Sequence, residues 1–256
     1  MSSYRQVALT LAVLAALAAG CSRSTPPATE KTMMPAAPTT LVPPHVLTLE
    51  PASGQAEYLV VLLHGVGASA DSFLPVAQAL APALPHAELV VPDGLYPFDG
   101  GPRGRQWFSI QGVTEQNRPE RVRRAGAEIS SWLDSALAAR GLGRERLVLV
   151  GFSQGAILAN WLVLHRQPAP LAVVSLSGRL AEDSPPAPGM TSAPVLLVHG
   201  GRDTIIPVGL VDEAARGLEA RGAHVRVRVL PALGHGVDGD VLQEMQRFLR
   251  EVLPHP

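Results

Sequence analysis

The chain has 256 residues, of which 46 % are hydrophobic and 17 % are charged, and its formal net charge at pH 7 is -1. This composition is typical of a globular protein, and the length allows one good-sized domain or two small ones. The 21 lysines and arginines are offset by 22 aspartates and glutamates, which excludes the basic excess that general nucleic-acid binding needs.

The single cysteine, Cys21, ends an apolar N-terminal segment. One thiol cannot form an internal disulfide, and the chain has no CxxC metal or redox motif. Residues 7–19 are an apolar run, with Thr10 as its one polar residue, that is too short to cross a hydrocarbon core of about 30 Å. A cation, an apolar run of this length and small residues at its end are the parts of a secretory signal peptide, which we predict for residues 1–20.

The residues before Cys21 also resemble a bacterial lipobox, in which the cysteine receives a diacylglyceryl group and becomes the first mature residue. Typical lipoboxes have leucine three residues before the cysteine, whereas here Ala18 holds that place and Leu17 stands one step earlier. The resemblance implies lipidation at Cys21 and stable attachment to a membrane. Ser22 after the cysteine points to the outer membrane of a Gram-negative bacterium. The alternative is an ordinary signal peptide with an unrelated cysteine.

Residues 21–44 are rich in proline and contain too few large apolar residues to build a core, so we predict a lipid-anchored tether. After about residue 45, short aliphatic runs alternate with longer stretches of helical period. The predicted strands are residues 45–49, 58–63, 88–91, 147–150, 172–176, 195–198 and 225–230. The predicted helices are residues 72–84, 119–140, 154–165, 207–221 and 240–252. The alternation predicts one α/β domain over residues 45–256, with a mostly parallel sheet and helices on both faces.

Two connections bear on a functional site. Residues 92–118 form the longest stretch without a regular pattern and are rich in glycine, proline and aromatic residues. Because ligands bind beyond the carboxyl ends of parallel strands, we expect this loop to border the substrate. Residues 177–194 are too short and too rich in proline for a separate lid domain.

The strongest chemical motif is Gly151-Phe152-Ser153-Gln154-Gly155, a G-x-S-x-G between a predicted strand and a predicted helix. The bare pattern is a weak indicator. Its context is stronger, because a serine on a sharp strand-to-helix turn is exposed for attack and flanking glycines avoid clashes. We therefore predict that Ser153 is a nucleophile. The alternative is that Ser153 only caps the helix.

A serine nucleophile needs a base, and the base needs an orienting carboxylate. In this type of fold the chain order is serine, acid, histidine, each just after a strand. Asp203 follows the predicted strand 195–198, and His235 follows the predicted strand 225–230. They are therefore the predicted acid and base.

Other side chains compete for these two roles. His64 and His199 also follow strands but come too early in the chain, and we expect structural hydrogen bonds from both. Asp93 precedes the serine, Asp183 lies in a proline-rich loop, and Asp238 is expected to start the last helix.

Acyl transfer also needs N–H donors aimed at the oxyanion, and the loss of one typically costs ~3 kcal/mol. The N–H of Gln154 comes directly after the predicted nucleophile. Residues 63–67 (LHGVG) follow an early strand, and we assign the second donor to the N–H of Val66.

With these pieces in place, the chain resembles the phospholipase/carboxylesterase family of compact α/β-hydrolases, which includes acyl-protein thioesterases and small bacterial esterases. The resemblance covers about residues 58–253. It rests on residues 63–67 (LHGVG), 104–108 (GRQWF), 151–156 (GFSQGA), 199–203 (HGGRD) and 234–237 (GHGV). It implies an α/β-hydrolase fold without a separate lid domain.

The resemblance also implies roles for individual residues. The catalytic roles fall on Ser153, Asp203 and His235, and the oxyanion donors on Val66 and Gln154. Trp107 and Phe108 become candidates for contact with the acyl group, with core packing as the alternative for Phe108. Thr204 departs from the family, in which proline is frequent, and we expect no loss of activity from it.

The function predicted from the sequence is hydrolysis of carboxylic esters through an acyl-serine intermediate, with thioesters and lysophospholipids as further candidate substrates. The resemblance implies no metal and no cofactor. The predicted partners are a small acyl ester or thioester and a membrane, and the oligomeric state stays open. The alternatives are a peptidase or polyester depolymerase with the same triad, and a non-catalytic surface lipoprotein.

Overall fold

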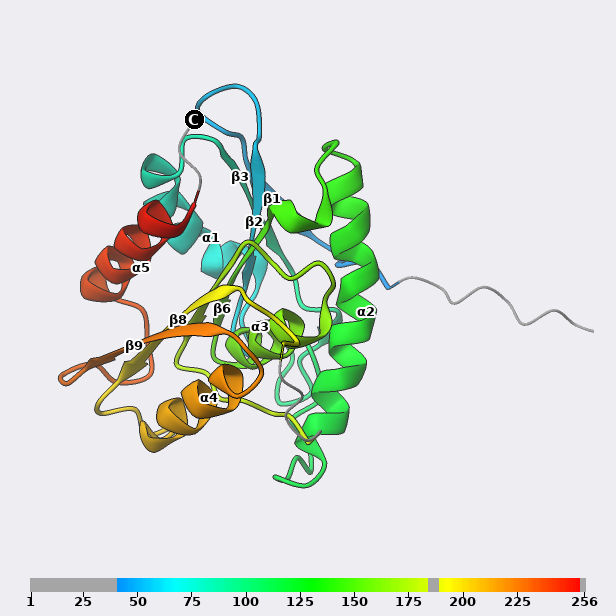
Figure 1. The fold of residues 1–256 in the computed structure, drawn as a ribbon. Coiled ribbons are helices and arrows are strands. Elements are labelled where there is room, and N and C mark those ends of the chain that lie inside the picture. The colour runs from blue at the N-terminus through cyan, green and yellow to red at the C-terminus, as the bar shows by residue number, and fades with distance from the viewer. Residues whose placement is uncertain (1–40, 184–188, 254–256) are drawn as a thin grey trace, which may run out of the picture. The chain divides into compact units, whose positions relative to one another are not determined.

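Seven strands form one sheet in the computed structural model, which describes residues 41–183 and 189–253. Their spatial order is β1-β3-β2-β6-β7-β8-β9, and Figure 1 labels all of these strands except β7. β1 runs antiparallel to β3, and all other neighbouring pairs are parallel. The strands are β1 (Val46–Leu49), β2 (Tyr58–Leu63), β3 (Ala87–Pro92), β6 (Leu147–Phe152), β7 (Ala172–Leu176), β8 (Pro194–Gly200) and β9 (His224–Leu230). The predicted α/β class and mostly parallel sheet are confirmed.

The predicted signal peptide, Cys21 and residues 21–40 of the predicted tether lie outside the described residues. Within the described part of the chain, no helix is both long enough and apolar enough to cross a bilayer. β1 begins at Val46, two residues after the predicted end of the tether.

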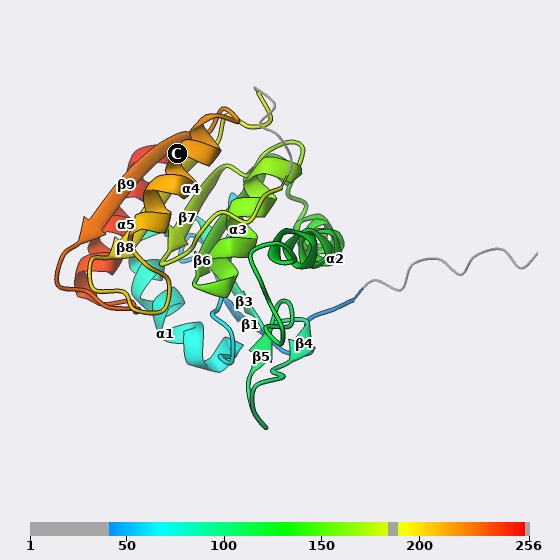
Figure 2. The same ribbon diagram turned by 90° about the horizontal axis from the view of Figure 1, so that it is seen from below.

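Helices cover both faces of the sheet (Figure 2), and its inner strands are therefore buried on both faces. α1 and α5 pack on one face and share a hydrophobic cluster with it. α2, α3 and α4 pack on the other face in a second cluster. The helices are α1 (Ala70–Leu80), α2 (Arg118–Ala138), α3 (Gln154–His165), α4 (Gly209–Glu219) and α5 (Gly239–Val252).

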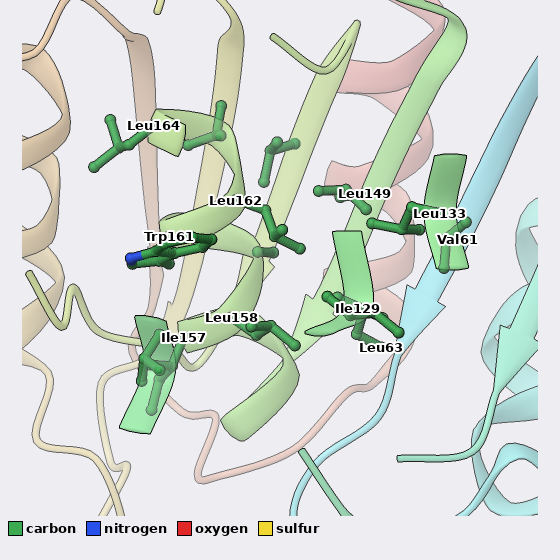
Figure 3. Close-up of a cluster of buried hydrophobic side chains, with 14 of the residues drawn as sticks. Val61, Leu63, Ile129, Leu133, Leu149, Ile157, Leu158, Trp161, Leu162 and Leu164 are labelled. Atoms are coloured by element: carbon green, nitrogen blue, oxygen red, sulfur yellow. The ribbon is translucent and has the colours of Figure 1, made fainter. Parts of the chain in front are cut away.

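α3 is the most deeply placed helix, since residues 154–164 are all buried. Its sequence is apolar on every side, which is the pattern of a helix enclosed by other elements. Figure 3 shows its side chains in one cluster with labelled residues of α2, β2 and β6. α2 and α3 approach closely at Gly126 of α2, because this residue has no side chain. A Cβ there would lie only 2.1 Å from Cε3 of Trp161 on α3.

Several elements differ from the prediction in their bounds, among them the loop of residues 92–118 and the start of α1. Residues 92–118, expected to be irregular, contain a short antiparallel pair, β4 (Tyr96–Pro97) and β5 (Arg105–Gln106). α1 begins two residues before its predicted start because Ser69 caps it. Ser69 Oγ accepts a hydrogen bond from the N–H of Ser72, and Ser72 Oγ accepts one from the N–H of Ser69.

The strand order fixes where a site can form. After β2 the chain forms β3 on one side of it, and then forms β6 on the other side. The order in which strands are added to the sheet therefore reverses at β2. In open α/β sheets, ligands bind beyond the carboxyl ends of the strands at such a point. Residues 64–67 follow β2 and Ser153 follows β6, so both predicted segments lie at this edge.

Candidate active site

Ser153 lies on a sharp turn between the end of β6 and the first residue of α3. Its backbone has φ 52° and ψ −114°, which is a strained conformation for a residue with a side chain. A Cβ on Gly151 would lie 2.4 Å from the carbonyl oxygen of Gly155, and one on Gly155 would lie 2.0 Å from that of Leu63. Ser153 occupies the N-cap position, but its side chain makes no capping hydrogen bond. Its hydroxyl is therefore available for another partner.

The structure brings Ser153, His235 and Asp203 into one hydrogen-bonded chain. Ser153 Oγ lies 2.9 Å from His235 Nε2, and His235 Nδ1 lies 2.7 Å from Asp203 Oδ2. An ionised carboxylate can only accept, so Nδ1 carries the imidazole proton. Nε2 is then the acceptor for the serine hydroxyl.

The carboxylate of Asp203 is fully shielded from solvent, and both of its oxygens accept hydrogen bonds. Its Oδ1 accepts the N–H groups of Ile205 and Ile206, each at 2.9 Å. Burial raises the pKa of Asp203, but the hydrogen bonds from His235, Ile206 and Ile205 outweigh it. The pKa therefore lies below its ordinary value, and Asp203 is ionised at neutral pH.

His64 and His199, the other histidines considered for the base, make the structural hydrogen bonds that we expected. Gly94 donates its N–H to His64 Nε2 at 2.9 Å, and His64 Nδ1 lies 2.7 Å from the carbonyl oxygen of Gly65. Burial lowers the pKa of His64, which favours a neutral ring. His199 Nε2 lies 2.8 Å from the carbonyl oxygen of Ile206.

The competing aspartates have other places in the fold. Asp93 Oδ1 accepts the N–H of Ala70 at the start of α1. Asp238 accepts the N–H of Val241 and begins α5, as predicted. Asp183 is exposed. Among the described residues, no group of three or more His, Cys, Asp or Glu side chains is arranged to hold a metal ion.

The side chain of Gln154 has a role that the motif did not indicate. Its Oε1 accepts the N–H of Trp107 at 2.8 Å, and its Nε2 donates to the carbonyl oxygen of Phe108 at 2.7 Å. Trp107 in turn donates its indole N–H to the carbonyl oxygen of His64. This buried amide therefore fastens the loop after β5 to the turn that carries Ser153.

Two cavities meet at Phe108. One, of about 230 Å³, contains Ser153 together with Val66 and Gln154. The other, of about 550 Å³, lies between the β4–β5 pair and α2 and is lined by Trp107 but not by Ser153. Phe108 lines both, whereas Trp107 is fully buried and lines only the second cavity. Of the two residues predicted to contact the acyl group, Phe108 therefore lines the Ser153 cavity and Trp107 does not.

Comparison with known proteins identifies the family. The profile of the phospholipase/carboxylesterase family matches residues 45–253. Esterase YpfH of Escherichia coli (strain K12) is 33 % identical over 202 residues, which cover 78 % of this chain and 84 % of that protein. Acyl-protein thioesterase 1 of Gibberella zeae is 25 % identical over 226 residues, which cover 80 % of this chain and 94 % of that protein.

A solved structure supports the same relationship. The crystal structure of esterase PE8 superposes with a TM-score of 0.73 at 31 % sequence identity, covering 81 % of this chain and 98 % of that chain. The chain therefore belongs to the phospholipase/carboxylesterase family. Its fold is that of the α/β-hydrolases, and its enzyme class is carboxylic ester hydrolase.

Proposed function

We propose that the protein cleaves carboxylic esters through an acyl-serine intermediate, with Ser153 as nucleophile, His235 as base and Asp203 as orienting acid. The observation that carries the proposal is the continuous hydrogen-bond chain from Ser153 Oγ through the imidazole to the buried carboxylate. This arrangement gives a weakly nucleophilic hydroxyl the base that it needs near neutral pH.

The reaction then runs in two halves. His235 Nε2 takes the proton of Ser153 as Oγ attacks the acyl carbon, and a tetrahedral intermediate forms. The bond to the leaving group breaks, and the imidazolium returns the proton to the departing alcohol or thiol. A water molecule, deprotonated by the same imidazole, attacks the acyl-serine and releases the carboxylic acid. Asp203 stays ionised throughout and stabilises the imidazolium.

The backbone N–H groups of Val66 and Gln154 are the proposed oxyanion donors. Both residues line the cavity that contains Ser153. Gln154 is the first residue of α3, where N–H groups have no intrahelical acceptor and the helix dipole is positive. A negative oxygen that develops beside Ser153 is stabilised by both effects.

The size of the Ser153 cavity bears on the acyl group. Its volume of about 230 Å³ lies below the range of roughly 300–1,000 Å³ that is typical of ligand pockets. A short or medium acyl group fits this cavity alone, and a longer chain would need the adjoining cavity of about 550 Å³ beyond Phe108. We propose acyl contact for Phe108, which lines this cavity, and a supporting role for the fully buried Trp107. The names of the relatives, an esterase and an acyl-protein thioesterase, support oxygen esters and thioesters, with lysophospholipids as a further candidate.

We further propose that the mature protein begins at a lipidated Cys21 and is anchored in the outer membrane of a Gram-negative bacterium. The support is the sequence of residues 1–22 and the proline-rich segment that follows. The alternative, an ordinary signal peptide, predicts a protein without an anchor.

The test compares substrates and serine variants. We expect hydrolysis of p-nitrophenyl acetate and butanoate, and a loss of at least about 10³-fold in kcat for Ser153→Ala. The matched control is Ser131→Ala, an exposed serine on α2, which should keep full activity. Faster cleavage of a peptide p-nitroanilide or a polyester film than of the small esters would favour the alternative activities. An active Ser153→Ala variant would contradict the proposed nucleophile.

A further inference from the structure

The cavity that contains Ser153 is lined by two arginines and by no described aspartate or glutamate. Arg118 is the first residue of α2, and Arg179 follows β7, so two separate elements bring cations to one cavity. Most of the remaining wall is apolar and comes from Ile110, Val113, Ile157, Ile205, Ile206 and Leu210. The cavity therefore combines hydrocarbon surface with positive charge.

Glu115 holds the two arginines beside each other without lining that cavity. Its Oε2 accepts from Arg118 Nη1 at 2.7 Å and also from Arg179 Nη2, and its Oε1 accepts from Arg179 Nη1 at 3.1 Å. The hydrogen bonds from Arg118 and then Arg179 hold the pKa of Glu115 below its usual value. One carboxylate offsets one of two positive charges among these three side chains, and Glu213 is a second carboxylate that lines a neighbouring cavity together with both arginines.

Arg118 has an unfavourable position with respect to the helix that it begins. A cation at the first residue of a helix faces the positive end of the helix dipole, which is unfavourable for Arg118. The side chains of Arg118 and Arg179 are only 15 % and 19 % exposed.

We propose that Arg118 and Arg179 determine specificity by binding an anionic group, a carboxylate or a phosphate, that the ester substrate carries. This assigns the substrate class of the Ser153 cavity, so it rests on the proposed function. Guanidinium groups bind carboxylate and phosphate oxygens through paired N–H donors. The apolar wall suits a hydrocarbon spacer between the ester and the anion.

The test uses two pairs of esters that differ in one charge. The monoester of glutaric acid with 4-nitrophenol is compared with 4-nitrophenyl pentanoate, which places the anion on the acyl side. 4-Acetoxybenzoate is compared with its methyl ester, which places the anion on the leaving group. We expect kcat/KM to favour the anionic member of one pair by about tenfold at low salt, the usual effect of a charge-assisted hydrogen bond. The pair that shows the preference identifies the side that carries the anion.

Variants separate recognition from structure. Arg118→Gln and Arg179→Gln should lower kcat/KM on the anionic ester more than on its neutral partner, so that the preference is lost. Arg124→Gln, an exposed arginine on α2 that does not line this cavity, should keep the preference. Glu115→Gln should increase the preference, because it removes the carboxylate that competes for both arginines. If the arginines only fasten the loop before α2, Glu115→Gln would instead slow all four esters alike.

The outcomes also separate this inference from the proposed function. Hydrolysis of neutral esters with no preference for either anion would overturn the inference and leave the proposed function standing. Arginine variants that lose activity on neutral and anionic esters equally would also overturn it. If wild-type protein hydrolyses none of the four esters, the proposed function itself is wrong.

Discussion

His235 Nε2 lies 2.9 Å from Ser153 Oγ, although 82 positions separate the two residues in the chain. Ser153 follows β6, whereas His235 follows β9, which stands three places further along the sheet. The loop after β9 therefore turns back across the end of β8. There it packs on Gly200, where a Cβ would lie only 2.2 Å from the carbonyl oxygen of Gly234. The missing side chain at Gly200 is what allows His235 to reach the serine.

We expect Gly200→Ala to reduce kcat/KM on p-nitrophenyl butanoate by about 100-fold, because a displacement of roughly 1 Å can cost that much. The new methyl group must push away the loop that carries His235. Gly209→Ala is the matched control, since nothing lies within 4 Å of a Cβ there. Circular dichroism of both variants establishes that they are folded. Full activity in Gly200→Ala would show that the close approach is not needed.

Asp203→Asn tests the electrostatics of the buried carboxylate through the pH dependence of stability. The folded-state pKa of Asp203 lies below its ordinary value, which is ~3.9 in an unfolded chain. The unfolded state therefore binds more protons in acid, and wild-type stability falls as the pH drops below about 4 towards the folded-state pKa. We expect the variant to be less stable than wild type at pH 7 and the difference to shrink below about pH 4. Urea unfolding between pH 3 and pH 7 measures it, and a constant difference would contradict the assignment.

Gln154→Ala tests the amide that joins the Ser153 turn to the loop after β5. The variant leaves the buried N–H of Trp107 and carbonyl oxygen of Phe108 without their partner. We expect a loss of about 1–3 kcal/mol in the free energy of unfolding, the usual cost of unpaired buried polar groups. Gln55→Ala, at an exposed position, should change stability little. Equal urea midpoints for the two variants would show that the buried amide contributes nothing.

Cys21→Ser tests the proposed anchor. Wild-type protein should sediment with membranes and dissolve in detergent, whereas the variant should appear in the soluble fraction, because two or three acyl chains are needed for stable attachment. Metabolic labelling with a fatty acid provides a second measurement. Membrane attachment that survives the substitution would rule out the lipid anchor at Cys21.

The sequence was most informative where local chemistry sets the structure. Continuous apolar runs such as residues 58–63 predict buried parallel strands, and β2 has those bounds. Gly151 and Gly155 predict a tight turn in which their positions have no room for a side chain. Ser153 lies on that turn and has a strained backbone. The order of strands then places His235 in contact with Ser153, and Asp203 in contact with His235. Their catalytic roles remain predictions.

Features that depend on distant side chains could not be predicted in this way. The motif predicts a role for the backbone N–H of Gln154, but its side chain also binds a loop 46 and 47 positions earlier in the chain. Glu115 and Arg179 are 64 positions apart, and neither belongs to a motif. The β4–β5 pair is two residues long on each strand, too short for a periodic pattern. Such contacts follow from packing once the sheet has formed.

The most direct measurement of the central claim is covalent labelling with a fluorophosphonate probe, in which the attacking serine oxygen displaces fluoride from phosphorus. The wild-type protein should be labelled at Ser153, with the modified peptide identified by mass spectrometry. Ser153→Ala should remain unlabelled at the same concentration and with the same fold. Equal labelling of the two proteins, or no labelling of either, would contradict the assignment of Ser153 as the nucleophile.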